Sequence, residues 1–281
     1  QYGGNITGNS TSDNGGGVYL DGSFFYMYGG RITDNSANNG GGVAGCVKDK
    51  VDGRRVIGSL LMLGGTIADN KATANGGGVA MDCSFEMRGG SITNNEAVAN
   101  GGGVAVIAAY TAQWSGGSVT GNTAQNSGGG VYVDSGAKAM AVGGDVNITR
   151  NINGNVYLPG GKKITVGGAL NDSASIGVTS EAVPDDSTPV TIATAADNWI
   201  NDNNFTADNS FYKVTVLDGK TATLGLHEHQ WKVRVKTGSE NILEEYCDVA
   251  GCTVADGTLT LEAPNQTYSG APYHAASCTK S

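Results

Sequence analysis

The sequence predicts an all-β fold: a right-handed parallel β-helix with three short strands in each coil of about 25–27 residues, followed by a small β-rich Cys/His module. Three observations predict it. Two glycine- and asparagine-rich phrases recur at an almost fixed period. The apolar runs between them alternate every second residue, as strands require. No run is long enough for a helix, and glycine occupies the joints.

The repeat consists of the phrases Gly-Gly-x-Ile-Thr-x-Asn and Asn-Gly-Gly-Gly-Val. Successive Gly-Gly pairs are 26, 35, 25, 27 and 27 residues apart, which is the spacing of a solenoid or array. The first phrase begins at Gly3, Gly29, Gly64, Gly89 and Gly116, with a stretched copy from Gly143. The second begins at Asn14, Asn39, Asn75 and Asn100, with a variant from Asn126.

Stacking these coils aligns the apolar residues into three inward ladders. The alternatives are another kind of β-solenoid and an array of β-sandwiches. The ladders are Ile6, Ile32, Ile67, Ile92 and Val119; Val18, Val43, Val79, Val104 and Val131; and Met27, Met62, Met87 and Trp114.

The asparagine that ends each first phrase is expected at a corner, in a left-handed backbone conformation, with amides hydrogen-bonded from coil to coil. The triple glycines are expected to supply positive φ or to allow two backbones to approach closely. The corner asparagines are Asn9, Asn35, Asn70, Asn95 and Asn122.

The pattern divides the chain into four segments: regular repeats over 1–158, irregular closing coils or a β-rich cap over 159–226, a His/Cys module over 227–258, and the start of a further β module over 259–281. Because the chain opens inside a repeat, we expect further domains of the same parent chain on both sides.

Composition argues against two classes of partner. The formal net charge is −9 with only 17 Lys and Arg, so a nucleic-acid surface is not expected. No apolar run reaches 18 residues, so we expect no membrane insertion of this segment.

The long interval in the repeat contains a charged insertion over residues 46–55, which we expect to leave the stack as a loop. Its basic residues suit a binding loop, and a solvated excursion is the alternative. These candidate ligand-binding residues are Lys48, Lys50, Arg54 and Arg55.

The cysteines allow two kinds of cross-link. Cys46 and Cys83 follow the same phrase in neighbouring coils and could form a disulfide, or remain two free thiols. His227, His229, Cys247 and Cys252 could form a tetrahedral zinc site, although their spacing is irregular. The alternative is a Cys247–Cys252 disulfide with two surface histidines. No cofactor is required otherwise.

Three tyrosines are expected on one outward face, since Tyr19, Tyr132 and Tyr157 each follow an inward valine. Exposed aromatic residues over a shallow polar surface favour glycan binding. An enzyme would need clustered carboxylates, and the best stacked pair is Asp34 and Asp69, which solvated charges also explain.

The Gly-Gly-Gly-Val and Ile-Thr-x-Asn phrases resemble the repeats of chlamydial polymorphic outer-membrane proteins, and still more the right-handed β-helix repeats of large surface proteins from gut Firmicutes. The tail, with His227-x-His229-x-Trp231 and Tyr268-x-Gly270, is similar to small modules that follow such helices. The resemblance implies a secreted or cell-surface adhesin-like protein and implies no catalytic residue.

We therefore expect an extracellular, non-catalytic bacterial surface protein that presents a rigid β-helix to a host or environmental glycan or surface protein. A polysaccharide lyase or glycoside hydrolase with a site on the outside of the helix is the first alternative. A mechanical spacer or stalk is the second.

Overall fold

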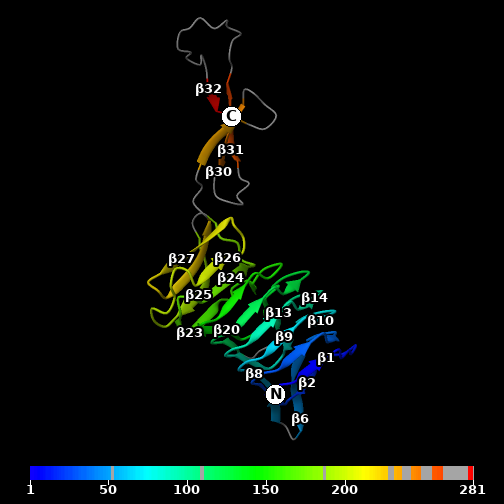
Figure 1. Cartoon of the computed structure of the whole chain (residues 1–281). Coiled ribbons are helices and arrows are strands. Elements are labelled where there is room, and N and C mark those ends of the chain that lie inside the picture. The colour runs from blue at the N-terminus through cyan, green and yellow to red at the C-terminus, as the bar shows by residue number, and fades with distance from the viewer. Residues whose placement is uncertain are drawn as a thin grey trace, which may run out of the picture. The chain divides into compact units, whose positions relative to one another are not determined.

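A computed structural model describes residues 1–51, 54–107, 111–185, 188–226, 231–235, 242–247, 255–261 and 278–280. The chain forms two compact units, Gln1–Gly225 and Leu226–Ser281, and each is described by itself. All the regular structure in the described residues is β, with no helix (Figure 1).

The first unit is a parallel β-solenoid of about seven turns. Two stacks of parallel strands form most of one 15-stranded sheet. The first stack is β1 (Asn5–Thr7), β4 (Arg31–Thr33), β9 (Thr66–Ala68), β13 (Ser91–Thr93), β17 (Ser118–Thr120) and β21 (Asn147–Thr149). The second is β2 (Val18–Asp21), β6 (Val43–Val51), β11 (Val79–Met81), β15 (Val104–Val106), β19 (Val131–Val133) and β22 (Val156–Leu158).

The strand β24 (Ser175–Ser180) joins these two stacks, because its first half pairs with β21 and its second half with β22. A separate sheet of nine strands forms another side of the coils and runs from blue to yellow in Figure 1. Its parallel strands are β3 (Phe24–Met27), β8 (Ser59–Met62), β12 (Ser84–Met87), β16 (Thr111–Trp114), β20 (Ala139–Gly144), β23 (Ile164–Leu170) and β25 (Val190–Ala195).

The middle coils contain four strands rather than the predicted three. The extra strand is two residues long and follows the corner asparagine, with a small alanine turned into the core. In the sequence, the recurring Asn-x-Ala spacing marks the position of this extra strand. The extra strands are β5 (Ser36–Ala37), β10 (Lys71–Ala72), β14 (Glu96–Ala97) and β18 (Thr123–Ala124).

The three predicted ladders are confirmed by strand register and burial. Ile6 pairs with Ile32 and Ile32 with Ile67, and the same alignment continues through Val119. The valine and methionine ladders align in the same way, and Trp114 completes the methionine ladder with no exposed surface. Since each ladder residue packs on its equivalents above and below, the core is a continuous apolar column.

The corner asparagines form a buried amide ladder, as predicted. Asn70 Nδ2 donates to Asn95 Oδ1 at 2.9 Å, and Asn95 Nδ2 donates to Asn122 Oδ1 at 2.9 Å. The left-handed residue is not the asparagine itself, however, but the residue before it, such as Asp34 and Asp69 at φ 57°. Asp, Asn and Gly tolerate this conformation best, which explains why they recur at that position.

The triple-glycine turn uses both properties that the sequence suggested. Gly40 has φ 63°, and a Cβ there would lie 2.3 Å from the carbonyl oxygen of Val43. Gly41 has an ordinary φ, but a Cβ would lie 2.4 Å from the carbonyl oxygen of Lys71 in the next coil. The turn therefore folds back over its own strand and packs against its neighbour without room for a side chain.

The charged insertion forms a β-hairpin and not the predicted loop. Strand β6 continues past the stack and pairs antiparallel with β7 (Arg54–Ile57), matching Val47 with Ile57 and Lys48 with Val56. The β-branched residues between the charged residues favour extended strands. The prediction of a loop rested on the charged residues alone. The side chains of Lys48, Lys50, Arg54 and Arg55 lie outside the described part.

An antiparallel hairpin follows the parallel stack. The strand β26 (Phe205–Ala207) pairs with β24, and β28 (Thr221–Leu226) pairs antiparallel with β25. Strand β27 (Tyr212–Leu217) lies beside β28, and the turn between them has positive φ at Asp218 and Gly219. An Asp-Gly pair with both φ positive is the type I′ turn that twisted hairpins favour.

The second unit contains a four-stranded antiparallel sheet of β29 (Trp231–Val235), β30 (Ile242–Cys247), β31 (Ala255–Leu261) and β32 (Cys278–Lys280). His227, His229 and Cys252 lie outside the described residues, and so does the side chain of Cys247. The zinc site and the Cys247–Cys252 disulfide therefore stay predictions. Within the residues that are described, no group of three or more His, Cys, Asp or Glu is placed to hold a metal.

Candidate functional site

The strongest surface feature lies on the outward face of the stack that runs from β2 to β22. Strand register aligns one outward residue from each coil into a column that we call the tyrosine column. It has aromatic residues at both ends and alanine in the middle. Its members are Tyr19, Ala44, Ala80, Ala105, Tyr132 and Tyr157.

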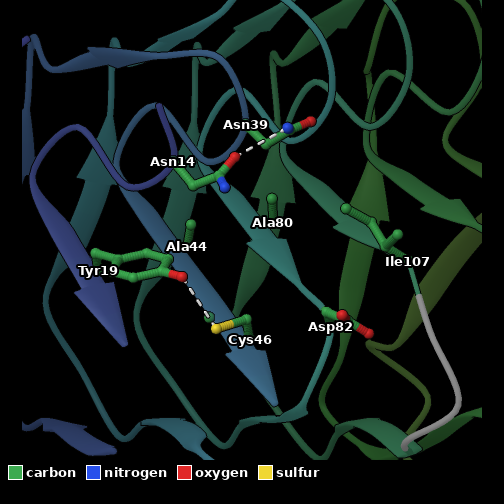
Figure 2. A pocket seen from close by; sticks show the side chains of 9 residues that line it. Asn14, Tyr19, Asn39, Ala44, Cys46, Ala80, Asp82 and Ile107 are labelled. Atoms are coloured by element: carbon green, nitrogen blue, oxygen red, sulfur yellow. Dashed lines mark hydrogen bonds between the residues drawn. The ribbon is translucent and has the colours of Figure 1, made fainter. Parts of the chain in front are cut away.

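A shallow pocket of about 160 Å³ lies at the N-terminal end of this column (Figure 2). Its volume is below the roughly 300–1,000 Å³ of drug-sized ligand sites, so it suits one small ring or one unit of a longer ligand. Residues from neighbouring coils line it: Asn14, Tyr19, Asn39, Ala44, Gly45, Cys46, Ala80, Asp82 and Ile107.

Tyr19 forms one wall of the pocket. Its ring reaches from β2 to the next coil, where its hydroxyl lies 3.0 Å from Cys46 Sγ (Figure 2). This hydrogen bond, followed by burial and the charges of Cys46, Asp21 and Asp13, raises the pKa of Tyr19 to about 12. Although the hydroxyl is held, the side chain is 49% exposed, so a ring surface remains for a ligand.

Four half-buried asparagines form the opposite wall and its continuation; we call them the outer asparagine column: Asn14, Asn39, Asn75 and Asn100. Asn39 Nδ2 donates to Asn14 Oδ1 at 3.0 Å. Figure 2 shows that the Asn14 amide nitrogen points into the pocket, and no acceptor for it lies among the described residues. The column therefore ends in an amide donor beside the Tyr19 ring.

The other end of the tyrosine column is a stacked aromatic pair. The rings of Tyr132 and Tyr157 lie 5.4 Å apart with an interplanar angle of 10°. Burial first, and then the charges of Asp134 and Glu181, raise the pKa of Tyr132. Burial and then Glu181 raise the pKa of Tyr157. Two carboxylates, those of Asp134 and Glu181, therefore lie near this end of the column.

The predicted disulfide between Cys46 and Cys83 is not formed, and both are free cysteines. Val43 pairs with Val79, so Cys46 and Cys83 differ by one residue in register and face opposite sides of the sheet. A Cβ on the inward side of Gly45 would lie 2.8 Å from Cys83 Sγ, which places that thiol in the core. Burial, followed by the charges of Cys46 and Asp82, raises the pKa of Cys83 to about 12.

The carboxylates weighed as an enzymatic pair, Asp34 and Asp69, lie on a different corner from the pocket. Both are exposed and both occupy the left-handed position. Asn94 and Gly121 take the same position in the next two coils. Backbone geometry is thus enough to explain why short polar residues or glycine occur there.

The structure brings only part of the predicted binding set together. It aligns Tyr19, Tyr132 and Tyr157 in one column, and the strand that carries Ala44 and Cys46 continues into the basic hairpin. Sequence reasoning missed the contributions of Asn14 and Cys46 to the pocket. The signal for Asn14 was present, since it begins the Asn-Gly-Gly-Gly-Val phrase five positions before Tyr19.

The pocket offers an aromatic ring and an amide donor on a stack of hydrogen-bonded coils. These groups suit a ligand with hydroxyls and a flat apolar face. No protein-family model, curated protein or solved structure matches this chain. Among the described residues, no helix is long and apolar enough to cross a bilayer.

Proposed function

We propose that this chain is an extracellular, non-catalytic, adhesin-like segment whose right-handed β-solenoid binds a host or environmental glycan at the Tyr19 pocket. A surface protein bearing the same sugars is an equivalent partner. The Cys/His module would follow the solenoid, with zinc as its only metal.

One observation carries the proposal: the exposed ring of Tyr19 lies beside an amide donor from Asn14 in a pocket of sugar-ring size. Aromatic rings stack on the apolar faces of sugars, while amides and carboxylates bond their hydroxyls. The coil-to-coil hydrogen bonds fix both groups before the ligand arrives, so little conformational entropy is lost on binding.

The basic hairpin supports a second contact region. Lys48, Lys50, Arg54 and Arg55 belong to strands that continue from the pocket strand β6. They would contact parts of the ligand that extend beyond the pocket.

The test is a retention panel of mucins, neutral and acidic polysaccharides and matrix proteins, mixed with the protein and assayed in the same tubes for new reducing ends and unsaturated sugars. The variant Tyr19→Ala is compared with Tyr26→Ala. Tyr26 is 47% exposed, close to Tyr19, but it lies on β3 in the other sheet.

We expect saturable retention of a glycan without product, lost in Tyr19→Ala and kept in Tyr26→Ala. Product release would instead establish a lyase or hydrolase. If no partner is retained, the mechanical spacer becomes the better account. If both variants retain the glycan equally, the binding site is not the Tyr19 pocket.

A further inference from the structure

We propose that an aromatic patch on the outward side of the nine-stranded sheet is a self-association surface, through which two copies of this chain form a two-fold symmetric dimer. The surface is separate from the Tyr19 pocket, since β2 and β3 belong to different sheets. We call it the aromatic patch, and its members are Tyr2, Phe24, Tyr26, Tyr28, Leu61 and Leu63.

Strand β3 and the residue after it form the centre of the patch. Alternation turns Phe25 and Met27 toward the core and leaves every second side chain outward. Phe24 is 62% exposed, and Tyr26 and Tyr28 are each 47% exposed. Residues two apart on a strand are about 6.6 Å apart, so these rings form a short straight row. Contiguous exposed apolar side chains of this kind are typical of interaction surfaces.

The next coil widens the patch, and the coil after that ends it. Tyr26 pairs with Leu61, and Leu63 follows two residues later on the same side, with both leucines half-buried. Leu61 in turn pairs with Glu86, whose Oε1 accepts from Arg88 Nε at 2.6 Å. An ion pair therefore borders the patch, and every member of the patch itself is uncharged.

The two tyrosines at one end of the patch turn ring edges outward. The rings of Tyr2 and Tyr28 are 4.6 Å apart with an interplanar angle of 4°. Parallel rings this close would collide in one plane, so they lie face to face. Tyr2 and Tyr28 belong to successive coils, because the backbone N–H of Tyr28 donates to Gln1 O at 2.8 Å. Each ring thus covers one face of the other, whereas edges suit the edge-to-face contacts of a protein interface better than sugar stacking.

Charge favours a second copy as the partner at this patch. The formal net charge of the chain is −9, and a large net charge keeps copies of a protein apart. Two copies that meet through an uncharged patch bordered by a neutral ion pair avoid most of this repulsion. A two-fold axis brings the same patch from both copies together, as most soluble homodimers do.

The exposed area fits a weak dimer. The four aromatic members of the patch are 84%, 62%, 47% and 47% exposed in chain order. At about 200 Å² for each aromatic side chain, they leave about 480 Å² on one copy and about 960 Å² on two. Specific interfaces begin at about 1,000–1,200 Å² in total, and the two leucines bring the patch to this range. We expect a reversible dimer with a Kd of about 10–100 μM.

The middle of the row fixes where the axis passes. Tyr26 lies between Phe24 and Tyr28 on the same strand and beside Leu61. A two-fold axis at Tyr26 sets Phe24 of one copy opposite Tyr28 of the other and brings the two Tyr26 side chains together. Central aromatic residues contribute most to binding, so Tyr26 is the residue to change first.

The experiment is sedimentation velocity of the full chain over about 1–300 μM protein. The wild type should change from monomer to dimer with rising concentration and should form nothing larger. Tyr26→Ala should raise the Kd about tenfold or more. The control Tyr19→Ala, which removes a ring of similar exposure from the other sheet, should dimerise as the wild type does.

A charge exchange tests the symmetry of the dimer. Tyr26→Asp and Tyr26→Lys should each stay monomeric alone, because the axis brings two like charges together. An equimolar mixture should form a heterodimer, since the opposite charges then meet. Tyr26 is exposed, so neither change disturbs the core, and an unchanged circular dichroism spectrum verifies the fold.

A wild type that stays monomeric over the whole range would overturn the proposal and leave the patch to a foreign partner. Association that continues beyond a dimer, or a Tyr26→Ala variant that dimerises normally, would also overturn it. A mixture of the charged variants that stays monomeric would contradict the axis at Tyr26. None of these results bears on glycan retention at about 1 μM protein, where every variant is a monomer.

Discussion

Two columns of asparagine run along this solenoid at almost the same spacing, and they differ in what surrounds them. The inner ladder lies at the corner after β1 and its equivalents, and Asn155 extends it just before β22. Its corner members are Asn9, Asn35, Asn70, Asn95, Asn122 and Asn151. The outer asparagine column lies beside the tyrosine column at the surface.

The inner ladder is closely hydrogen-bonded. Every Nδ2 to Oδ1 distance along it is 2.9 or 3.0 Å, and its amides also donate to core carbonyls such as Ile67 O. In the outer column the same bonds measure 3.0, 3.3 and 3.3 Å. The two columns also run in opposite directions. Inner amides donate toward the C-terminal coils, and outer amides donate toward Asn14.

This difference shows that burial, rather than residue type, determines whether an asparagine column stabilises the fold or borders the binding surface. Four inner asparagines are at most 1% exposed, so a missing partner would leave a buried polar group unpaired. The outer asparagines are half-buried and water can replace a lost bond. We therefore assign the inner ladder to stability and the outer column to the binding surface.

The largest effect is expected from breaking the inner ladder in its middle. Asn95→Ala removes the acceptor for the backbone N–H and the amide of Asn70 and the donor to Ile67 O. Because these groups are buried, the free energy of unfolding should fall by about 3 kcal/mol or more. Urea titration followed by circular dichroism measures it. A change below about 1 kcal/mol would contradict the assignment.

The next effect is expected at the C-terminal end of the inner ladder. Asp208 accepts hydrogen bonds from the backbone N–H and amide of Asn155 and from Thr179 Oγ1. A carboxylate suits this position, because Asn155 at the end of the ladder presents only N–H donors to it. Asp208→Asn exchanges one acceptor oxygen for a donor and should cost about 1–2 kcal/mol. Full stability in Asp208→Asn would show that the ladder needs no acceptor at its end.

The cysteines allow the same inside-and-outside comparison through pH. Burial raises the pKa of Cys83 from 9.0 to about 12, so the folded protein keeps this proton longer than the unfolded chain does. The resulting stability is fully present below pH 9 and is lost as the pH rises toward 12. Cys83→Ala should flatten the fall in melting temperature over this range. An unchanged slope would contradict the assignment to Cys83, and Cys46→Ala is the control.

The smallest effect on stability is expected in the outer column. Asn75→Ala removes the amide donor to Asn39 Oδ1 and the acceptor for the backbone N–H and the amide of Asn100, all at half-buried positions. Its free energy of unfolding should fall by no more than about 1 kcal/mol. A loss as large as that of Asn95→Ala would remove the distinction between the columns.

Most of the solenoid could be predicted from sequence, because each ladder repeats one residue type at one spacing. Ile32 to Ile67 and Val43 to Val79 needed only periodicity. The fourth strand was missed because two residues give no alternation to detect. The Cys46–Cys83 disulfide was wrong because it needs the register, which a difference of one residue reverses. The hairpin β6–β7 was missed because the prediction of a loop relied on the charged residues and gave no weight to the β-branched residues between them.

The binding surface was less predictable than the core. Alternation placed Tyr19, Tyr132 and Tyr157 outward, and their alignment followed from the repeat. The pocket depends on the Asn14 amide, whose direction is set by the bond from Asn39 Nδ2. Nothing in the residue order of the Asn-Gly-Gly-Gly-Val phrase distinguishes that direction from the opposite one.

The most direct test of the central claim is tyrosine nitration, mapped by mass spectrometry, with and without a saturating glycan from the retention panel. The raised pKa of Tyr19, about 12, lowers the fraction of phenolate that reacts, so each tyrosine is compared with its own nitration rate in the free protein. The account predicts that the glycan slows the nitration of Tyr19 and leaves the nitration rates of Tyr26 and Tyr28 unchanged. Slower nitration of Tyr26 and Tyr28, or an unchanged rate at Tyr19, would contradict it.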